Sequence, residues 1–491
     1  MAQGMQVATR RAAATAAFFD GAAYAVEVTG WPAAHRRPAD PVTAPPGARL
    51  QLWAIDPAQG RRMPPPTGPG GVLLASTTFS LANSGNRTKY ASKRSWKVDL
   101  EPGDDDEQVA DMRRLNLKAM YNDPSQMREA LAWATFGHAQ IVAPRHTFAR
   151  MSLNGDYLGL FSVVEEVDRR FLRRHFDPAD RGNLYKAYCG DLGCATLEHR
   201  CGPGGDGGAA YVSHDPDDGT YRLKTNKDDA GQNTRDDLAE LVRVIHGTGL
   251  PAGASFGSDA YAEALREVFD VEAFLRWAGA NVLLGSWDNY FATPANYYLY
   301  NGGRPGAERD VVSRPYFTWI PWDYDNCLGI DYFGVRWQYA DLLDWPAGTR
   351  PYWARQGRPN KVSSIPLVSN VLANQAFVAY YLDHLEYLLD TWFTTQAFDE
   401  RIRALWARVS PSAYLEADTP YGSAFTGRQF VNDEVYRAGK RQWELRRGEA
   451  KIDGIHHYVR MRYDSAREQL GALRRVHPAG SSGATFPIVA R

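Results

Sequence analysis

Two short β-prone runs, each next to an acidic or amide side chain, constrain the fold most strongly. The run at residues 297–300 directly follows Asn296, and the run at residues 317–321 ends just before Asp323. A Gly-rich turn at residues 301–306 follows the first run, which favours an antiparallel hairpin of the two runs. In such a hairpin the first strand starts where the second strand ends. We therefore expect Asn296 and Asp323 to share one end of a sheet.

Carboxylate and amide side chains at this sheet end predict a magnesium site. Magnesium takes oxygen ligands and is usually held by one or two protein side chains together with substrate phosphates, which points to nucleotide chemistry. We assign Asn296 and Asp323 as magnesium ligands, and Asp325 either as a ligand of a second metal or as an outer-shell anchor. The alternative is that these aspartates only bond to backbone amides in strand-terminal turns, where Asp is common.

The order of three polar residues matches the order found in protein kinases. A protein kinase uses an Asp beside the acceptor hydroxyl, then an Asn for a metal, then an Asp on a second strand for magnesium. Asp288, Asn296 and Asp323 follow this order, and we assign Asp288 as the catalytic residue that orients the hydroxyl and accepts its proton. The gap from Asp288 to Asn296 is longer than in His-Arg-Asp-x-x-x-x-Asn, and Asp-Phe-Gly is missing, so an ordinary protein kinase is excluded.

Short motifs precede this site along the chain. They are Gly85-Asn86-Arg87-Thr88, Lys93-Arg94-Ser95-Trp96-Lys97-Val98, Leu115-Asn116-Leu117, Asp123-x-Ser125-x-Met127-Arg128, Asn154-Gly155-Asp156-Tyr157-Leu158-Gly159-Leu160-Phe161 and Val164-Glu165-Glu166-Val167-Asp168. Together with the site, and in this order, they resemble the CotH family of atypical kinases, which are secreted or coat-associated proteins. The resemblance covers most of the chain and implies a two-lobed, diverged protein-kinase-like α+β fold, with a mixed β N-lobe and a helical C-lobe. It also implies ATP- and magnesium-dependent transfer of phosphate to Ser or Thr of a protein substrate.

The resemblance also assigns residues to the nucleotide phosphates. Lys97 would contact the α- and β-phosphates, and Glu165 is our candidate for the acid that pairs with Lys97. Without the resemblance, the pattern favours a solvated lysine on an exposed strand face for Lys97, and the alternative role of Glu165 is to cap the helix at residues 168–176. Arg87 and Lys89 are predicted to cover the phosphates in place of a Gly-rich loop. Two positions depart from the family pattern: Ser84 stands where the family usually has Arg, and Arg87 stands where it has Ser.

Hydrophobic periodicity predicts most of the remaining elements. Trp96 and Val98 alternate with Lys97, which predicts a strand at residues 95–100 with one buried face. Asn154-Gly155 predicts the turn of a hairpin between strands 148–154 and 159–164. One further strand is expected at residues 72–81, and helices at residues 125–139, 168–176, 236–246, 271–285, 375–391, 395–409 and 453–473.

Changes in composition along the chain predict five parts. Gly and Asp without apolar periodicity mark the third part as an exposed insertion. The parts are an N-terminal strand pair with Pro-rich loops (1–70), a β-rich N-lobe-like part with a helix (71–186), the Gly/Asp/Cys-rich insertion (187–220), a catalytic and helical C-lobe-like part (221–480) and a tail (481–491).

Charge and hydropathy limit the partners and the location. A formal net charge of −1 with 23% charged residues favours neither nucleic acid nor an anionic membrane. No run of eighteen apolar residues is present, so no membrane span is expected. Residues 9–19 faintly resemble a secretion signal, but Asp20 interrupts the apolar stretch. We expect a cytoplasmic protein, with a secreted or coat-associated protein as the alternative.

Three of the four cysteines cluster in the insertion. Cys189, Cys194 and Cys201 allow a disulfide, or a zinc site completed by His199 or His214, although the spacing matches no standard zinc motif. Four cysteines are too few for a disulfide scaffold in a chain of 491 residues. We expect three loop thiols without a ligand.

Three functions remain open from the sequence. The first is an ATP-dependent kinase acting on Ser or Thr of a protein, which the combination of Lys97, Asp288, Asn296 and Asp323 favours. The second is a catalytically silent coat-assembly or binding module on the same fold. The third keeps ATP but changes the reaction, for example to ligation or nucleotidyl transfer. The mass of the product distinguishes all three.

Overall fold

The protein has an α+β fold, as expected from the sequence. A computed structural model describes residues 17–19, 23–35, 40–55, 72–85, 88, 91, 93–100, 112–176, 181–190, 193–198, 220–304, 310–344, 365–416, 440–445 and 448–486. The chain divides into two compact units. Unit 1 comprises residues 1–133, 144–171 and 399–437, and unit 2 comprises residues 134–143, 172–398 and 438–491. Each unit thus joins segments that are distant in the sequence.

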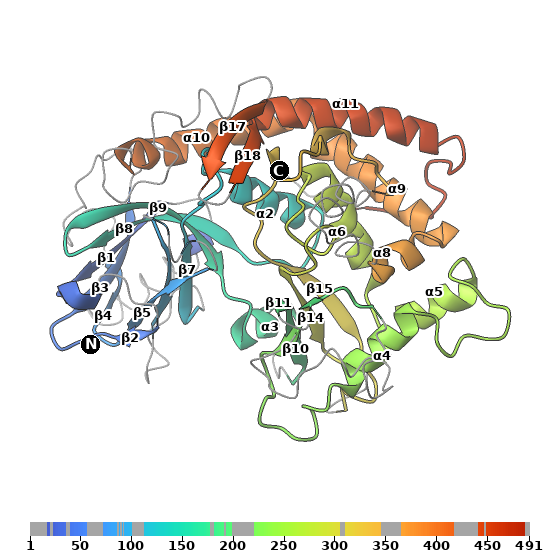
Figure 1. The fold of residues 1–491 in the computed structure, drawn as a ribbon, viewed down its shortest axis with the longest axis horizontal. Coiled ribbons are helices and arrows are strands. Elements are labelled where there is room, and N and C mark those ends of the chain that lie inside the picture. The colour runs from blue at the N-terminus through green and yellow to red at the C-terminus, as the bar shows by residue number, and fades with distance from the viewer. Residues whose placement is uncertain are drawn as a thin grey trace, which may run out of the picture. The chain divides into compact units, whose positions relative to one another are not determined.

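Unit 1 is built on a large curled sheet, drawn in blue to cyan in Figure 1. The strand order is β2-β5-β6-β7-β9-β8-β1-β3-β4, and neighbours are antiparallel except for β1 and β8, which are parallel. The described strands are β1 (Ala23–Thr29), β2 (Val42–Thr43), β3 (Arg49–Ile55), β4 (Val72–Ser76), β5 (Ser80–Ser84), β6 (Ser95–Asp99), β7 (Arg114–Lys118), β8 (His146–Leu153) and β9 (Asp156–Glu165), with 3-10 turns η1 (Ala17–Phe19) and η2 (Ala33–His35).

Two strand predictions for unit 1 are confirmed and one is wrong. Trp96 and Val98 of β6 are buried while Lys97 is partly exposed, as the alternation predicts. The β8–β9 hairpin turns at Asn154 (φ 53°) and Gly155 (φ 85°), the positive angles that such a two-residue turn requires. The single strand expected at residues 72–81 is instead two strands, because β4 pairs with β3 whereas β5 pairs with β6 at the other side of the sheet.

Unit 2 contains the predicted hairpin. Strands β14 (Tyr297–Asn301) and β15 (Phe317–Pro321) pair antiparallel within a four-stranded sheet of order β13-β10-β14-β15. A second small sheet has the order β16-β18-β17. The other described strands are β10 (Asn183–Ala187), β11 (Cys189–Gly190), β12 (Gly193–Cys194), β13 (Tyr221–Leu223), β16 (Ile330–Asp331), β17 (Lys440–Leu445) and β18 (Gly448–Asp453).

Helices account for most of the rest of unit 2. Helix α6 (Val271–Leu284) is buried on most sides, as the sequence predicts, and contacts α9 (Gln375–Thr391), which has the predicted bounds. The others are α4 (Asp236–Ile245), α5 (Asp259–Arg266), α8 (Pro366–Val371), α11 (Ile455–Leu473) and the 3-10 turn η5 (Trp337–Tyr339). Helices α2 (Arg128–His138), α3 (Arg169–His175) and α10 (Thr395–Glu416) include residues of both units.

No helix in the described part of the chain is both long enough and apolar enough to cross a membrane.

Candidate functional site

The β14–β15 hairpin brings Asn296 and Asp323 to one end of the sheet, as predicted. Tyr297 and Pro321 face each other in the register, and the backbone N–H of Trp322 donates to the carbonyl oxygen of Asn296 at 3.0 Å. Asn296 and Asp323 have positive φ angles of 56° and 64°, which Asn and Asp tolerate better than most residues. Both residues therefore turn out of their strands at the same place.

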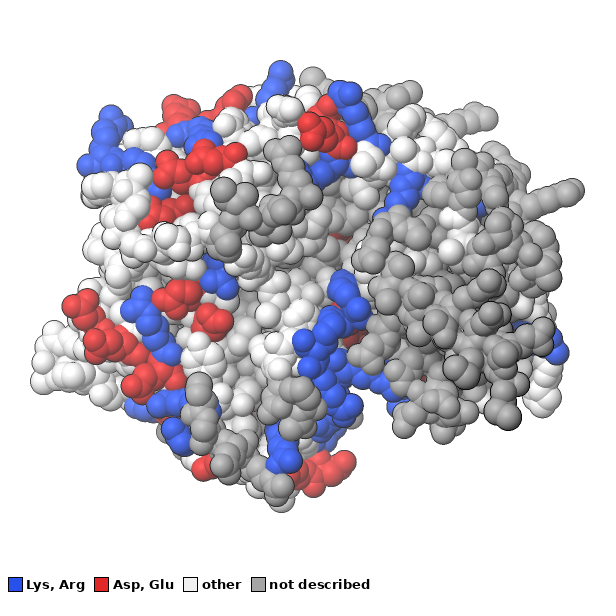
Figure 2. Space-filling view, turned by 180° about the vertical axis from the view of Figure 1, so that it is seen from behind, with Lys and Arg blue, Asp and Glu red and all other residues white. Residues whose placement is uncertain are grey.

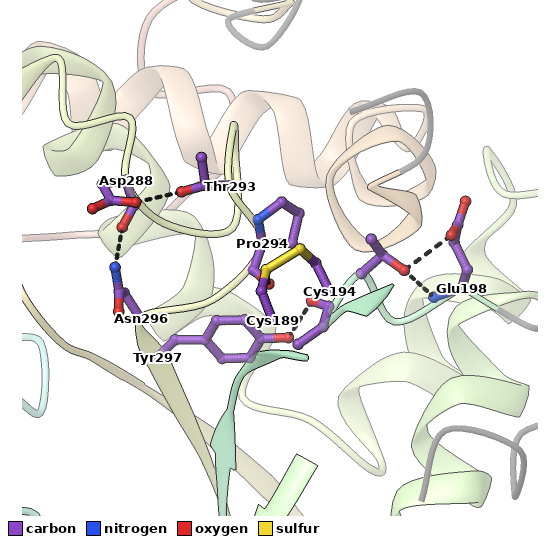
Figure 3. The surroundings of a disulfide bond; sticks show 10 residues. Cys189, Cys194, Glu198, Asp288, Thr293, Pro294, Asn296 and Tyr297 are labelled. Carbon is purple, nitrogen blue, oxygen red and sulfur yellow. Dashed lines mark hydrogen bonds between the residues drawn. A yellow bond between two sulfur atoms is a disulfide. The ribbon is translucent and has the colours of Figure 1, made fainter. Parts of the chain in front are cut away.

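Asp288 lies in a hydrogen-bonded cluster with residues from both sides of the hairpin. The Thr293 hydroxyl donates to Asp288 Oδ1 at 2.6 Å, and the amide of Asn326 donates to Asp288 Oδ2 at 3.0 Å. The Asn296 amide nitrogen donates to the backbone oxygen of Asp288 at 2.7 Å, as Figure 3 shows. Asn326 was not predicted, although it follows Asp325 directly in the sequence. The cluster fixes the orientation of the Asp288 carboxylate.

A buried tyrosine between the two acids anchors the segment that follows β15. Asp323 and Asp325 are half-buried, whereas Tyr324 is fully buried. The Tyr324 hydroxyl accepts from the Trp277 indole at 2.6 Å and donates to Asn281 Oδ1 at 3.1 Å, so it is held by helix α6. Tyr324 is therefore fixed in the core, while the acids on either side of it keep exposed surface.

The same helix holds the loop that carries Asp288. Helix α6 ends at Gly285, whose φ is 59°, and a Cβ there would lie 2.1 Å from the Tyr458 hydroxyl. The amide of Asn289 donates to Asn281 Oδ1 at 2.9 Å and to the Ser286 carbonyl at 3.1 Å. The chain therefore leaves α6 in a fixed direction and delivers Asp288 to the hairpin.

The donor atoms at this site suit magnesium with phosphate co-ligands. The amide nitrogen of Asn296 is used by Asp288, so the amide oxygen is the atom that Asn296 offers to a metal. Among the described residues, no group of three or more His, Cys, Asp and Glu side chains is placed to hold a metal ion. Asn296, Asp323 and Asp325 carry oxygen atoms of the kind that magnesium takes as ligands.

Lys186 places a positive charge near the rings of Tyr298 and Trp322. Its ammonium group lies 5.4 Å from the ring centroids of both Tyr298 and Trp322, and Lys186 faces Tyr298 in the β10–β14 register. Trp322 directly precedes Asp323.

Lys and Arg side chains gather in a column on the face of the protein that Figure 2 shows. A chain of nearly zero net charge therefore carries locally basic surface.

The predicted ion pair of Lys97 and Glu165 is wrong, because each residue pairs with a neighbour. The Lys97 ammonium donates to Glu166 Oε1 at 3.0 Å, and Asn116 donates to Glu166 Oε2 at 2.8 Å. Glu165 accepts from the Arg145 guanidinium at 2.9 Å. Consecutive side chains at the end of a strand point to opposite faces, so Glu166 and not Glu165 shares the face of Lys97.

A second lysine–glutamate pair in unit 1 was not predicted from the sequence. Lys118 is the last residue of β7, and it forms an ion pair with Glu129 in the first turn of α2. Ser162 donates to Glu129 Oε2 at 2.8 Å, and the imidazole of His146 lies 2.9 Å from the Ser162 hydroxyl. Burial, followed by Arg408 and Lys118, lowers the pKa of His146 well below its ordinary value, which keeps the imidazole neutral.

The motif around Asp123 fixes the start of the helix that carries Glu129. Asp123 accepts from the backbone N–H of Arg128 at 2.7 Å and from the Arg128 guanidinium at 2.6 Å, with both side chains buried. Ser125 also donates to Asp123, through its backbone N–H at 2.9 Å. A lysine at the end of a strand, followed by this capping motif and a helical glutamate, is the signal that could have revealed the Lys118–Glu129 pair.

A third charged pair, Lys93 and Glu416, is structural. Both side chains are at most 2% exposed, and the Lys93 ammonium lies 2.8 Å from Glu416 Oε2. Lys93 also donates to the Leu160 carbonyl at 2.5 Å, and the Leu160 N–H donates to Glu416 Oε2 at 3.0 Å. Gly159 has φ 126°, and a Cβ there would lie 2.7 Å from Glu416 Oε2, so only glycine fits beside this pair.

Two of the three clustered cysteines form a disulfide. Cys189 is bonded to Cys194, so the expectation of three free thiols is wrong for this pair, and a zinc site using both is excluded. Cys201, His199 and His214 lie outside the described residues, as do Arg87, Lys89 and most of the predicted insertion.

The matched family model decides the relationship. The model described as CotH kinase protein matches residues 81–465, which is most of the chain. The chain belongs to the CotH kinase protein family. Its motifs, from Lys93 to Asp325, all lie within the matched range, so the predicted resemblance is confirmed.

Several curated relatives carry the CotH name. Inner spore coat protein H of Bacillus subtilis (strain 168) is 27% identical over 307 residues, covering 62% of this chain and 70% of the relative. Invasin CotH2 of Rhizopus delemar is 27% identical over 265 residues, which cover 52% of this chain and 38% of the invasin. Invasin CotH3 of the same organism is 24% identical over 338 residues, 67% of this chain and 48% of the invasin. The matches span less than half the length of these invasins.

Proposed function

We propose that this CotH protein transfers phosphate from ATP, with magnesium, to Ser or Thr of a protein substrate. The observation that carries the proposal is the cluster at the end of the β14–β15 hairpin, where Asn296 bonds to Asp288 and lies beside the start of the Asp323 turn. A binding module has no evident need for the buried hydrogen bonds from α6 that hold the segments carrying these polar groups. A diverged protein-kinase fold is part of the proposal.

Asp288 is the catalytic residue of the proposal. A phosphoryl transfer with a loose transition state needs little proton abstraction, so the main task of this residue is to orient the acceptor hydroxyl. Thr293 and Asn326 donate to separate oxygens of its carboxylate and hold its plane. Asp288 then accepts the hydroxyl proton late in the transfer.

Asn296, Asp323 and Asp325 are the proposed magnesium ligands. Magnesium supplies the positive charge that neutralises the triphosphate. Asn296 offers its amide oxygen, and the buried Tyr324 holds the two carboxylates that flank it. These residues orient the phosphates relative to Asp288.

Two lysine–glutamate pairs in unit 1 compete for the role of the phosphate-binding pair. Lys97 remains a proposed phosphate ligand, now held by Glu166. Lys118 and Glu129 reproduce the kinase arrangement of a strand lysine paired with an acid on the next helix. Arg87 and Lys89 stay proposed phosphate contacts.

A calorimetric titration of ATP tests the metal and the acids together. We expect ATP to bind with magnesium and to bind much more weakly in EDTA. Asp323→Ala should weaken magnesium–ATP binding, whereas Asp288→Ala should keep binding and lose rate by about 10²-fold or more. Asp310→Ala, which removes an exposed aspartate of the same unit, is the control and should change neither. Equal ATP affinity in EDTA contradicts the metal assignment.

The relatives' names favour a second candidate, a catalytically silent coat or attachment module. One relative is named an inner spore coat protein and others are named invasins. A silent module would add no mass to any protein in the presence of ATP, whereas ligation or nucleotidyl transfer would add a different adduct. Intact mass after incubation with magnesium–ATP separates these outcomes.

The disulfide bears on the location of the protein. Disulfides form and persist in oxidising environments and are rare in the cytosol. The Cys189–Cys194 bond therefore supports the coat-associated alternative over the cytoplasmic one. Titration of thiols in the protein unfolded without reductant tests this, because Cys189 and Cys194 contribute none if the bond is present, and at most two of the four cysteines then react.

A further inference from the structure

A disulfide closes a small hairpin next to the candidate site. Cys189 in β11 and Cys194 in β12 face each other and are bonded. The segment that follows, Ala195–Leu197, is buried, although it belongs to no strand or helix. Such a buried irregular segment needs partners for its backbone groups.

Three of those partners come from the loop that carries Asp288 and Asn296 or from Tyr297, which directly follows it. The Ala195 N–H donates to the Pro294 carbonyl at 2.9 Å, and the Tyr297 hydroxyl donates to the Ala195 carbonyl at 2.7 Å. The Tyr290 hydroxyl donates to the Thr196 carbonyl at 2.7 Å. Figure 3 shows the disulfide beside Pro294 and Tyr297, with Asp288, Thr293 and Asn296 beyond them.

The disulfide completes a closed path through the site. Cys189 follows β10, and β10 pairs with β14, the strand that begins directly after Asn296. From Cys189 the path crosses the sulfur–sulfur bond to Cys194, passes to Ala195, and crosses the hydrogen bond to Pro294. Pro294 lies between Thr293, which bonds to the Asp288 carboxylate, and Asn296. The loop is thus held from β14 and from Ala195.

We infer that Cys189 and Cys194 are positioning residues, whose disulfide holds residues 287–296 in the geometry that orients Asp288. The inference rests on the proposed function for its effect on catalysis, but its effect on the loop does not depend on any activity. Without the disulfide, the segment at residues 195–197 keeps only its non-covalent hold and the loop becomes more mobile. The orientation of the Asp288 carboxylate is then disturbed more than the affinity for ATP.

The test compares the wild-type protein with the Cys189→Ser/Cys194→Ser double variant. Hydrogen–deuterium exchange should become faster in residues 287–297. If the protein is a kinase, kcat should fall about 10- to 100-fold, because small misplacements of a catalytic group cost this much, while KM for ATP changes little. A protein in which the disulfide is merely structural would lose melting temperature without this split between kcat and KM.

A matched pair of tyrosine variants provides the control. Tyr297→Phe removes the hydroxyl that holds the Ala195 carbonyl and should reproduce the faster exchange with the disulfide intact. Tyr261→Phe removes a buried hydroxyl of the same unit that donates to the Ile245 carbonyl at 3.2 Å and not to this loop. Tyr261→Phe should leave the exchange of residues 287–297 unchanged.

A reversible experiment covers the case in which the double variant does not fold. Treating the folded wild-type protein with a dithiol breaks the sulfur–sulfur bond, leaves two protein thiols and converts the dithiol to its own disulfide. Both cysteines are half-buried rather than enclosed, so the reductant has access. Faster exchange of residues 287–297 on reduction supports the inference, and unchanged exchange in a fully reduced, folded protein overturns it. Absence of phosphate transfer by the oxidised wild type would instead overturn the proposed function and leave the exchange result standing.

Discussion

Removing one partner of the buried Lys93–Glu416 pair should destabilise unit 1 strongly. Glu416→Gln leaves the Lys93 ammonium facing a neutral amide in a site where both side chains are at most 2% exposed. Burial already lowers the pKa of Lys93, and the Glu416 carboxylate opposes that shift. The variant therefore either buries an unpaired charge or forces Lys93 to release its proton.

The expected size follows from this geometry. Breaking a buried ion pair from one side costs about 3–5 kcal/mol, whereas an exposed pair contributes about 0–1 kcal/mol. For a folding unit of this size, a loss of about 3–5 kcal/mol corresponds to a fall in melting temperature of about 6–20 °C. The double variant Lys93→Met/Glu416→Met buries no charge, so its loss should be smaller than the sum of the two single losses. Some loss remains, because the Leu160 N–H and carbonyl lose a partner each.

Urea unfolding followed by circular dichroism measures these differences, with Glu240→Gln as the control. Glu240 pairs with Arg243 on an exposed helix surface, so its loss should be small. The stability of Glu416→Gln should also recover as the pH rises toward about 10, because the unfolded chain then loses the proton that the folded Lys93 has already lost. A Glu416→Gln variant that is no less stable than Glu240→Gln would refute the reasoning.

Three further predictions concern single residues. Lys97→Met and Lys118→Met should identify the phosphate-binding lysine, because the variant at the true site raises KM for ATP or lowers kcat sharply in steady-state kinetics while the other does not. Burial lowers the pKa of His384 to about 3. Below pH 6.5 the folded state therefore binds fewer protons than the unfolded state. The free energy of unfolding should fall by up to about 1.4 kcal/mol per pH unit on acidification. His384→Leu should flatten this slope in urea titrations between pH 6 and 4. Asn374→Ala should cost about 1 kcal/mol in the same assay, since Asn374 caps α9 by accepting from two backbone N–H groups.

Local patterns predicted the elements and the hairpin that forms the site. The bounds of α9 and the pairing of β14 with β15 follow from hydrophobic period and turn chemistry, which act over a few residues. The prediction that Asn296 and Asp323 lie at the same end of the sheet followed from that pairing alone. These features depend on neighbours in the chain, and a single sequence contains that information.

Contacts between segments that are distant in the chain were not predicted from the sequence. Lys93 and Glu416 are 323 residues apart, and nothing local indicates that they meet. The choice of Glu165 for Lys97 was wrong by one residue, because the face on which a side chain emerges depends on exactly where β9 ends. Asn326 and the Cys189–Cys194 bond likewise depend on how loops fold onto the hairpin.

Transfer of phosphate to protein is the central claim, and intact mass spectrometry tests it most directly. The native protein is incubated with magnesium–ATP and candidate protein substrates, in parallel with Asp288→Ala, Asp323→Ala and the Asp310→Ala control. We predict that the wild type and the control add the mass of phosphate to Ser or Thr residues, and that both site variants fail to do so. No added mass with any substrate, a different adduct, or equal transfer by the two site variants would contradict the account.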